Sequence, residues 1–367
     1  MDTLKKVNLL AEGAKYDVCL SSCLGGRKRD PKDPICKWIY PAVLPDGRFI
    51  PLLKILMDNA CKNRCLYCAQ RNGRVFQEVS FTPDELASFF LRLAQEGLVH
   101  GLFLSSAHSH DPNFVMEKMV KAVSIVRKSF QGYVHLKILP GVSLDYVEKA
   151  VELADRVSLN LEAPNRERLK KIAPEKAFIK ELIEPMRKAG ALISQRKGRA
   201  KSQITQFVVG ASDESDYELL KTTTWLYKEV GLYRAYFSSF HPIPQTPMEN
   251  HKPTPLIREH RLYQAEFLLR NYGFSLSDIV FDEDGNLSER FDPKMNWAIS
   301  HPERFPVEIN DADYYELLRV PGIGPKSAKE IVYSRRKSKF HSKEDLRRTP
   351  VVLKRALPWI TIDGCKI

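Results

Sequence analysis

The sequence lacks the features that place a chain in a membrane or outside the cell. Its 367 residues contain no uninterrupted apolar run of about 18 residues, the length that spans a bilayer. The first residues, MDTLKKVNLLAEGAKYD, are polar and periodic, without the apolar core of a secretory signal. We therefore expect a cytoplasmic protein with no membrane partner. Low-complexity tracts and repeats of solenoid length are missing too. With 43% hydrophobic residues, the chain is expected to bury a sizeable core.

Cysteine is scarce, at seven residues, and its positions are uneven. Three lie in the first 50 residues, three lie within eight residues of one another, and one is next to the last two residues of the chain. The cytoplasm is a reducing compartment, so these thiols are better candidates for metal ligands than for disulfides.

Acidic residues are few where the chain is most basic. The formal charge is +12, and the segment 319–355 holds twelve Lys and Arg against three acidic residues, a net +9. Three quarters of the excess charge therefore lies in about a tenth of the sequence. A basic patch of this density favours a polyanionic partner, most simply nucleic acid. The alternative is a solvated tail that only keeps the protein soluble.

Apolar runs alternate with helical patterns between about residues 50 and 240. The strand candidates are Pro51–Met57, Gly101–Ser106, Tyr133–Leu139, Arg156–Leu161, Gln203–Gly210 and Tyr233–Ser239. The helical stretches between them include Pro83–Gly97, Asn113–Phe130, Ser143–Ala154 and Glu214–Gly231. Apolar rather than alternating strands are typical of a parallel sheet buried on both faces. The pattern predicts an α/β fold, either doubly wound or curled into a partial barrel.

Four domains are expected from these patterns. They are an extension with cysteines of its own (1–50), the α/β domain (51–240), a proline-rich covering segment and linker (241–308), and a compact basic helical tail (309–367).

The central motif is the loop DNACKNRCLYCAQR, which spaces three thiols as Cys61-x3-Cys65-x2-Cys68. It follows the first strand of the α/β domain, where the active-site loops of such barrels lie. Thiolates are the usual ligands of iron–sulfur clusters, and three of them leave one iron of a four-iron cluster without a protein ligand. An open position marks a catalytic metal site rather than a structural one. The alternatives are a zinc site completed by a distant residue, or three unrelated thiols.

The tail carries a glycine turn between two helical patterns, Val320-Pro321-Gly322-Ile323-Gly324. It resembles a helix–hairpin–helix DNA-binding motif. Glycines let the hairpin backbone approach a phosphate, and the next helix directs free N–H groups at it. Lys326 adds charge and Ser327 a donor, so we expect DNA contacts at Gly322, Ile323, Gly324, Lys326 and Ser327. The alternative is a helical hairpin that contacts another protein.

The cysteine loop followed by five strand–helix units resembles the radical S-adenosylmethionine (SAM) superfamily. This resemblance implies a partial (βα)6 barrel that carries a small all-α helix–hairpin–helix domain. It implies two cofactors, a [4Fe–4S] cluster on Cys61, Cys65 and Cys68, and SAM bound to the fourth iron. Reductive cleavage of SAM would then give a 5′-deoxyadenosyl radical that abstracts hydrogen from a substrate.

The resemblance also implies which strand ends bind SAM. Ser105 and Ser106 stand where relatives carry a Gly-Gly-Glu motif, which leaves only hydroxyls for that contact. Glu162 matches a carboxylate position that binds SAM. Adenine contacts are expected from Tyr67, mostly through its backbone, and from the strand end with Gln206, Val208 and Gly210. His108 and His110 are further candidates to face the substrate.

Over nearly its whole length the chain is similar to one family, DNA modification and repair radical SAM proteins linked to a uracil-DNA-glycosylase-like partner. The motifs include KYDVCLSSC, LLKILMDNAC, NLEAP and HPERFPVEIN. A reductant such as flavodoxin or ferredoxin is expected. Cys19, Cys23 and Cys36 are either a second metal site or spare thiols. Two other functions stay open, an RNA- or tRNA-modifying radical SAM enzyme and a DNA-binding adaptor whose cluster is not catalytic.

Overall fold

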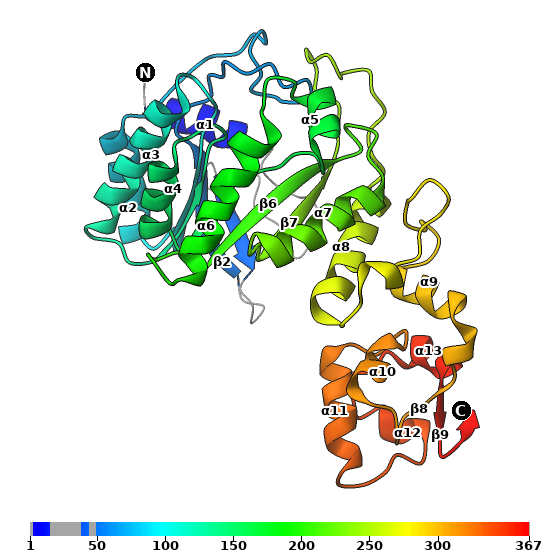
Figure 1. The fold of residues 1–367 in the computed structure, drawn as a ribbon. Helices are drawn as coiled ribbons and strands as arrows, with labels where there is room; N and C mark the ends of the chain where they lie inside the picture. Colours follow the sequence, from blue (N-terminus) through cyan, green and yellow to red (C-terminus); the bar gives the residue numbers. More distant parts are fainter. Residues whose placement is uncertain (1–2, 15–37, 44–48, 367) are drawn as a thin grey trace. The chain divides into compact units, whose positions relative to one another are not determined.

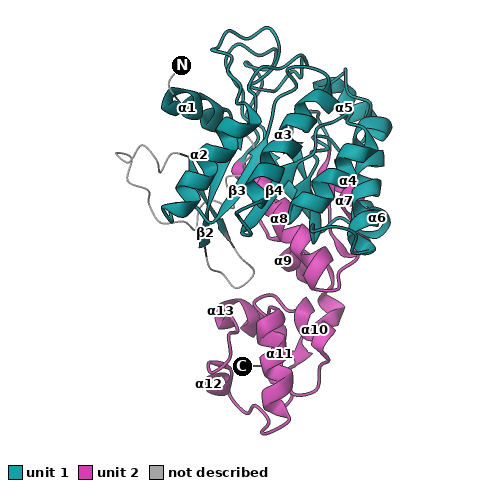
Figure 2. Cartoon of the chain, turned by 90° about the vertical axis from the view of Figure 1, so that its left-hand side faces the viewer, with its two compact units in different colours: residues 1–214, 225–255 teal, residues 215–224, 256–367 magenta. Residues whose placement is uncertain are grey.

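The computed structural model describes residues 3–14, 38–43 and 49–366. They form two compact units, shown in different colours in Figure 2. Unit 1 comprises residues 1–214 and 225–255, and unit 2 comprises residues 215–224 and 256–367. In the described part of the chain, no helix has the length and apolar character that crossing a membrane requires.

Unit 1 is built on a seven-stranded sheet in which the strands follow one another in chain order. The strands are β1 (Ile39–Val43), β2 (Phe49–Leu56), β3 (Gly101–Ser105), β4 (Tyr133–Lys137), β5 (Arg156–Ser158), β6 (Ser202–Val209) and β7 (Arg234–Ser239). β1 is antiparallel to β2, and β2 to β7 are all parallel. Six parallel strands in sequential order, each pair joined by a helical crossover, confirm the curled partial barrel and exclude the doubly wound sheet.

Helices cover the outer face of this sheet. They are α2 (Pro83–Gln95), α3 (Pro112–Arg127), α4 (Leu144–Leu153), α5 (Arg166–Ile172) and α6 (Glu184–Ser194). α1 (Thr3–Ala14) contacts β2, and α7 (Asp216–Glu229), between β6 and β7, is divided between the two units. In Figure 1, α2, α3, α4 and α6 lie on one side of the sheet. α2 begins with a full capping box: the Thr82 hydroxyl accepts from the Glu85 N–H, and the Glu85 carboxylate accepts from the Thr82 N–H. The inner face of the sheet is thereby left for a site.

Two elements of unit 1 differ from the predicted ones. The antiparallel edge strand β1 lies inside the predicted N-terminal extension. β5 was expected to run from Arg156 to Leu161 but ends at Ser158. The chain returns to the sheet at a single bridge between Glu162 and Phe207, where Glu162 has a φ of 66°. Between these two points the Thr205 hydroxyl takes the place of ladder partners, because it donates to the Leu159 carbonyl and accepts from the Leu161 N–H.

Unit 2 packs the segment after residue 256 together with the tail. Its helices are α8 (Leu256–Asn271), α9 (Pro293–Ser300), α10 (Tyr314–Arg319), α11 (Pro325–Arg335), α12 (Lys343–Leu346) and α13 (Leu353–Ala356). The helical tail is confirmed. A small sheet that the sequence did not predict joins β8 (Val307–Glu308), at the end of the predicted linker, to β9 (Ile360–Ile362) and β10 (Cys365–Lys366) of the tail. Trp297 joins the two segments through ring contacts with Phe274, His301 and Phe305.

Candidate active site

The cysteine loop begins directly after β2, and backbone hydrogen bonds tie it to the segments that follow two other strands. Its entry is held by Met57, whose N–H donates to the Ser105 carbonyl at the end of β3. Further along, the Lys62 N–H donates to the His108 carbonyl (2.6 Å) and the Leu66 N–H donates to the Ile172 carbonyl (2.7 Å). The loop is therefore tied to the segments that follow β3 and β5, so its thiols are held at the mouth of the barrel.

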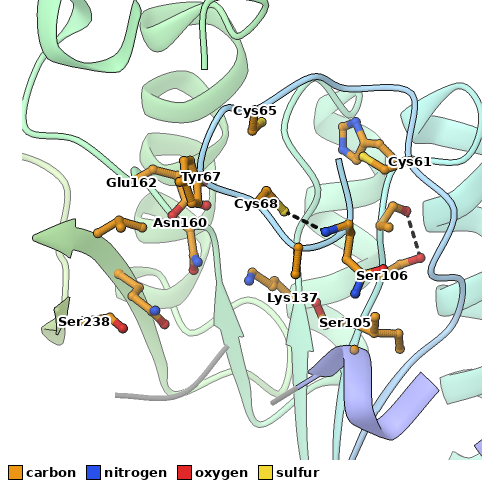
Figure 3. A pocket seen from close by; sticks show the side chains of 18 of the residues that line it. Cys61, Cys65, Tyr67, Cys68, Ser105, Ser106, Lys137, Asn160, Glu162 and Ser238 are labelled. Carbon is orange, nitrogen blue, oxygen red and sulfur yellow. Dashed lines mark hydrogen bonds between the residues drawn. The ribbon is translucent and has the colours of Figure 1, made fainter. Parts of the chain in front are cut away.

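A cavity of about 610 Å³ opens beside this loop, within unit 1. Its walls include all three thiols of the loop and the ends of β3, β5, β6 and β7. Figure 3 shows Cys61, Cys65 and Cys68 on the loop, with Ser105 and Ser106 below them and Tyr67 beside Glu162. The volume lies in the range of small-molecule and cofactor sites. The structure thus brings the predicted cluster ligands and predicted SAM contacts to one cavity.

Cys61, Cys65 and Cys68 are free thiols, and burial shifts the pKa of two of them, Cys65 and Cys68. Burial raises the pKa of Cys65, and it raises the pKa of Cys68 to about 12. The Cys68 sulfur accepts a hydrogen bond from the Gln70 N–H, which favours the thiolate only in part. Metal binding therefore has to displace protons from Cys65 and Cys68, as it does at other thiolate sites.

The donor set fits a cluster better than a single ion. Within the described ranges, no three Cys, His, Asp or Glu side chains converge on a position for one metal ion. A structural zinc needs such convergence, with ligands about 2.0–2.3 Å from one centre. A four-iron cluster takes one thiolate per iron, so its ligands stand around a volume rather than a point. The buried Nε2 of His108, which lines the cavity, has no hydrogen-bond partner among the described residues, and an orphaned polar atom of this kind suits a bound group.

Glu162 is held at the cavity wall in an unusual conformation. Its φ of 66° is a left-handed value that costs a non-glycine residue energy. The neighbouring strand fixes it there, because its N–H donates to the Gln206 carbonyl (3.0 Å) and its carbonyl accepts from the Val208 N–H (2.8 Å). Its carboxylate lies 3.8 Å from the Lys176 ammonium, with both side chains about nine tenths buried. Burial, followed by the Glu162 charge, raises the pKa of Tyr67, so this phenol stays protonated.

Lys176 is the functional candidate that sequence reasoning missed. Its ammonium lies within electrostatic range of all three loop thiols as well as Glu162, and those charges raise its pKa against the effect of burial. Together with burial, it also lowers the pKa of His108 to about 4, so that imidazole is neutral at neutral pH. Lys176 lies in a loop after α5, fourteen positions beyond Glu162, and no spacing rule marks it.

Of the remaining residues predicted to contact SAM, all but Gly210 line the cavity. Ser105, Ser106, Gln206 and Val208 line the cavity with Tyr67 and Glu162. Gly210 is not among the lining residues. Its φ of 84° requires glycine, and its N–H donates to the Glu214 carboxylate, which also accepts from Ser212. Cys19, Cys23 and Cys36 lie outside the described residues, so a second metal site stays a prediction.

The hairpin of unit 2 connects α10 to α11, as expected. Gly322 has a φ of 90°, and a side chain there would meet the Val352 carbonyl at 2.7 Å, so both conformation and packing require glycine. Lys326 is exposed on the first turn of α11. Ser327 is buried, and its hydroxyl donates to the Pro350 carbonyl (2.7 Å), which ties the hairpin to the segment before α13. The Ile323 side chain is buried too, which leaves the backbone of this residue for contacts.

Comparisons with known protein families agree with both motifs. The radical SAM superfamily model matches residues 55–226, and a helix–hairpin–helix motif model matches residues 304–357. Comparison with curated protein sequences finds no match.

Solved structures with a similar chain path include methylornithine synthase, at 17% identity and a TM-score of 0.48 over 59% of this chain. Another is the FeFe-hydrogenase maturase HydG from Carboxydothermus hydrogenoformans, at 14% identity and a TM-score of 0.48 over 58% of this chain. The matches span 60% and 50% of the length of those two proteins.

Proposed function

We propose that this chain is a radical SAM enzyme, with a [4Fe–4S] cluster and SAM as its cofactors, and that it acts on DNA in repair or modification. The observation that carries the enzymatic part is the cavity lined by three thiols and by the Glu162–Lys176 pair. The DNA target is supported by the helix–hairpin–helix motif and the concentrated charge around it.

Cys61, Cys65 and Cys68 are the residues that would hold the cluster, one thiolate to each of three irons. When bound, the cluster and SAM supply reductive cleavage of the sulfonium and hydrogen abstraction from a substrate. The chain contributes a loop fixed by backbone hydrogen bonds and a cavity whose walls would position the reacting groups.

Two buried charges of opposite sign suit the amino-acid end of SAM. The Glu162 carboxylate is complementary to an ammonium, and the Lys176 ammonium is complementary to a carboxylate. Tyr67, protonated and half-buried, donates a hydrogen bond to the Glu162 carboxylate and keeps it oriented. We assign further contacts with SAM to Ser105, Ser106, Gln206 and Val208, because their side chains or backbone line the same cavity.

The hairpin is assigned to the DNA backbone. The first N–H groups of α11 have no partner within their own helix and favour an anion. Lys326, exposed beside them, adds a mobile positive charge. Such contacts bind phosphates without reading sequence, and they weaken steeply with salt.

Protein partners are proposed on chemistry and family resemblance. Lys62 and Arg64 are exposed between the cluster cysteines, and this basic loop is complementary to an acidic electron donor such as flavodoxin or ferredoxin. A uracil-DNA-glycosylase-like partner is proposed from the family resemblance alone.

An anaerobic assay tests the enzymatic part. The cluster is reconstituted, dithionite and SAM are added, and 5′-deoxyadenosine is measured for wild type and for Cys65→Ala. We expect product from wild type only; equal yields from both proteins would reject a catalytic cluster. Parallel reactions with duplex DNA and with RNA show which polymer stimulates turnover, and stimulation by RNA alone would favour the RNA-modifying alternative.

A second experiment tests the hairpin. Gly322→Val combined with Lys326→Glu should weaken duplex DNA binding while SAM cleavage without DNA is kept. Lys252→Glu, an exposed residue of unit 1 outside the basic segment, is the control for the change of charge. Loss of both activities in the hairpin variant would contradict separate roles for the two units.

A further inference from the structure

A buried lysine lies directly behind the hairpin, and neither the cavity nor the proposed phosphate contacts use it. Lys294, on the first turn of α9, is 8% exposed. Its ammonium donates to the carbonyl of Ile323, the residue between the two hairpin glycines. It also lies 5.0 Å from the centre of the Tyr272 ring. Both contacts lie within unit 2, as does the hairpin.

The charged groups around this ammonium come from the N-cap of α9 itself and from two further helices, α10 and α13. Asp292 caps α9 and pairs with Arg355 of α13, and Arg319 approaches from α10. Burial lowers the pKa of Lys294 to about 7, with Asp292 acting to raise it and the two arginines acting to lower it. Lys294 therefore has no strong ion pair of its own, because the Asp292 carboxylate is already paired with Arg355.

The contact with Ile323 has a consequence for the next peptide N–H. In a trans peptide the carbonyl and the following N–H point in opposite directions. A carbonyl held by Lys294 therefore directs the Gly324 N–H away from Lys294, and the positive charge polarises that peptide group further. Gly324 is the N-cap of α11, so this N–H belongs to the group of donors assigned to phosphate.

A buried lysine is a poor way to stabilise a fold, since an apolar residue of similar size is often neutral or better at such a position. The position of the Lys294 ammonium on the Ile323 carbonyl is explained if its charge orients the hairpin rather than stabilising the core.

We propose that Lys294 is a positioning residue for the hairpin, and that its protonated form orients and polarises the hairpin donors that bind a DNA phosphate. This inference rests on the proposed DNA binding. It follows that the phosphate-binding element needs the segment that carries α9 as well as the hairpin motif.

If Lys294 acts in its protonated form, DNA binding should be coupled to proton uptake. A phosphate bound at the hairpin favours the charged form of Lys294, so binding near neutral pH takes up a proton. DNA affinity should then fall as pH rises from about 6 to about 8.5, and a rise of about one unit in the Lys294 pKa on binding corresponds to a fall of about tenfold. Lys294 does not itself reach the phosphate in this account, so removing it should leave the salt dependence of binding unchanged.

The experiment uses the full-length protein and a short labelled DNA duplex. Affinity is measured by fluorescence anisotropy across pH and salt for wild type, Lys294→Met, Lys294→Gln and Lys326→Glu. Calorimetry in buffers of different ionisation enthalpy measures proton uptake. We expect Lys294→Met to lose affinity at low pH, the pH dependence and the proton uptake, with an unchanged salt slope. Lys326→Glu, which removes a phosphate contact, should instead lower the slope by about 0.9 or more and keep the proton uptake.

Lys294→Gln separates charge from hydrogen bonding, because the amide can still donate to Ile323 but cannot titrate. It should recover part of the affinity without proton uptake. If wild type does not bind the duplex, the proposed function fails. If wild type binds without proton uptake, or if the folded Met and Gln variants keep the wild-type pH profile, the role of Lys294 is refuted while DNA binding stands.

Discussion

Glu162→Gly sets two effects of known sign against each other. Glycine relieves the left-handed backbone at φ 66°, which is a gain of about 1–3 kcal/mol. It also removes the carboxylate that lies 3.8 Å from the Lys176 ammonium. Removing one partner of a buried pair costs about 3–5 kcal/mol, because the other charge is left buried and uncompensated. The loss is the larger effect, so we expect a net destabilisation of about 2 kcal/mol.

Urea unfolding of the iron-free protein measures this balance. Lys176→Met is added to Glu162→Gly to remove the unpaired charge, and the double variant should recover to within about 1 kcal/mol of wild type. Asp213→Gly is a matched control, since Asp213 also has a positive φ, of 56°, but its partner Lys171 is half exposed. There the strain is relieved at little electrostatic cost, so stability should be unchanged or slightly raised.

One result would refute this reasoning. If Glu162→Gly were as stable as wild type while Asp213→Gly behaved as expected, the Glu162–Lys176 pair would not compensate a buried charge. The proposed pairing of these residues with the two charges of SAM would then lose its electrostatic basis.

Three further predictions concern other parts of the fold. Arg319→Ala should lower the stability of unit 2 by about 2–3 kcal/mol in thermal unfolding, because Arg319 lies 3.9 Å from the Phe274 ring centre, 4.7 Å from that of Trp297, and 3.1 Å from Asp278; an unchanged melting temperature would contradict it. Since the pKa of Lys294 is lowered to about 7 in the fold, its neutral form is favoured there, and the stability of unit 2 should rise from about pH 7 upward; Lys294→Met should abolish this rise. Gly190→Ala should prevent stable folding of unit 1, since its Cβ would lie 2.0 Å from the Val230 carbonyl oxygen; normal circular dichroism and melting would show that α6 shifts freely.

The sequence was most informative where one short segment determines the structure. The spacing of Cys61, Cys65 and Cys68 and the hairpin at Gly322 each depend on a few adjacent residues; the three cysteines lie together on one loop at the cavity, and the hairpin forms as expected. The order of the parallel strands could be narrowed only to two topologies, because the hydrophobic pattern of a buried strand does not say which strand lies next to it.

The parts that escaped prediction depend on residues brought together by the fold. Lys176 and Lys294 are lysines among many, and only burial next to a carboxylate or a hairpin carbonyl distinguishes them. Ser327 was predicted to contact a phosphate, but it lies in the first turn of α11 on the side that packs against Pro350. Helical position, rather than residue type, decided its direction.

The most direct test of the account is transfer of hydrogen from DNA. The reconstituted enzyme is given SAM, dithionite and a uniformly deuterated DNA duplex, and the 5′-deoxyadenosine is analysed by mass spectrometry. The account predicts deuterium in this product for wild type, and much less product for the Gly322→Val, Lys326→Glu variant under DNA-dependent conditions. Product free of deuterium, at a rate that DNA does not change, would contradict the claim that DNA is the substrate.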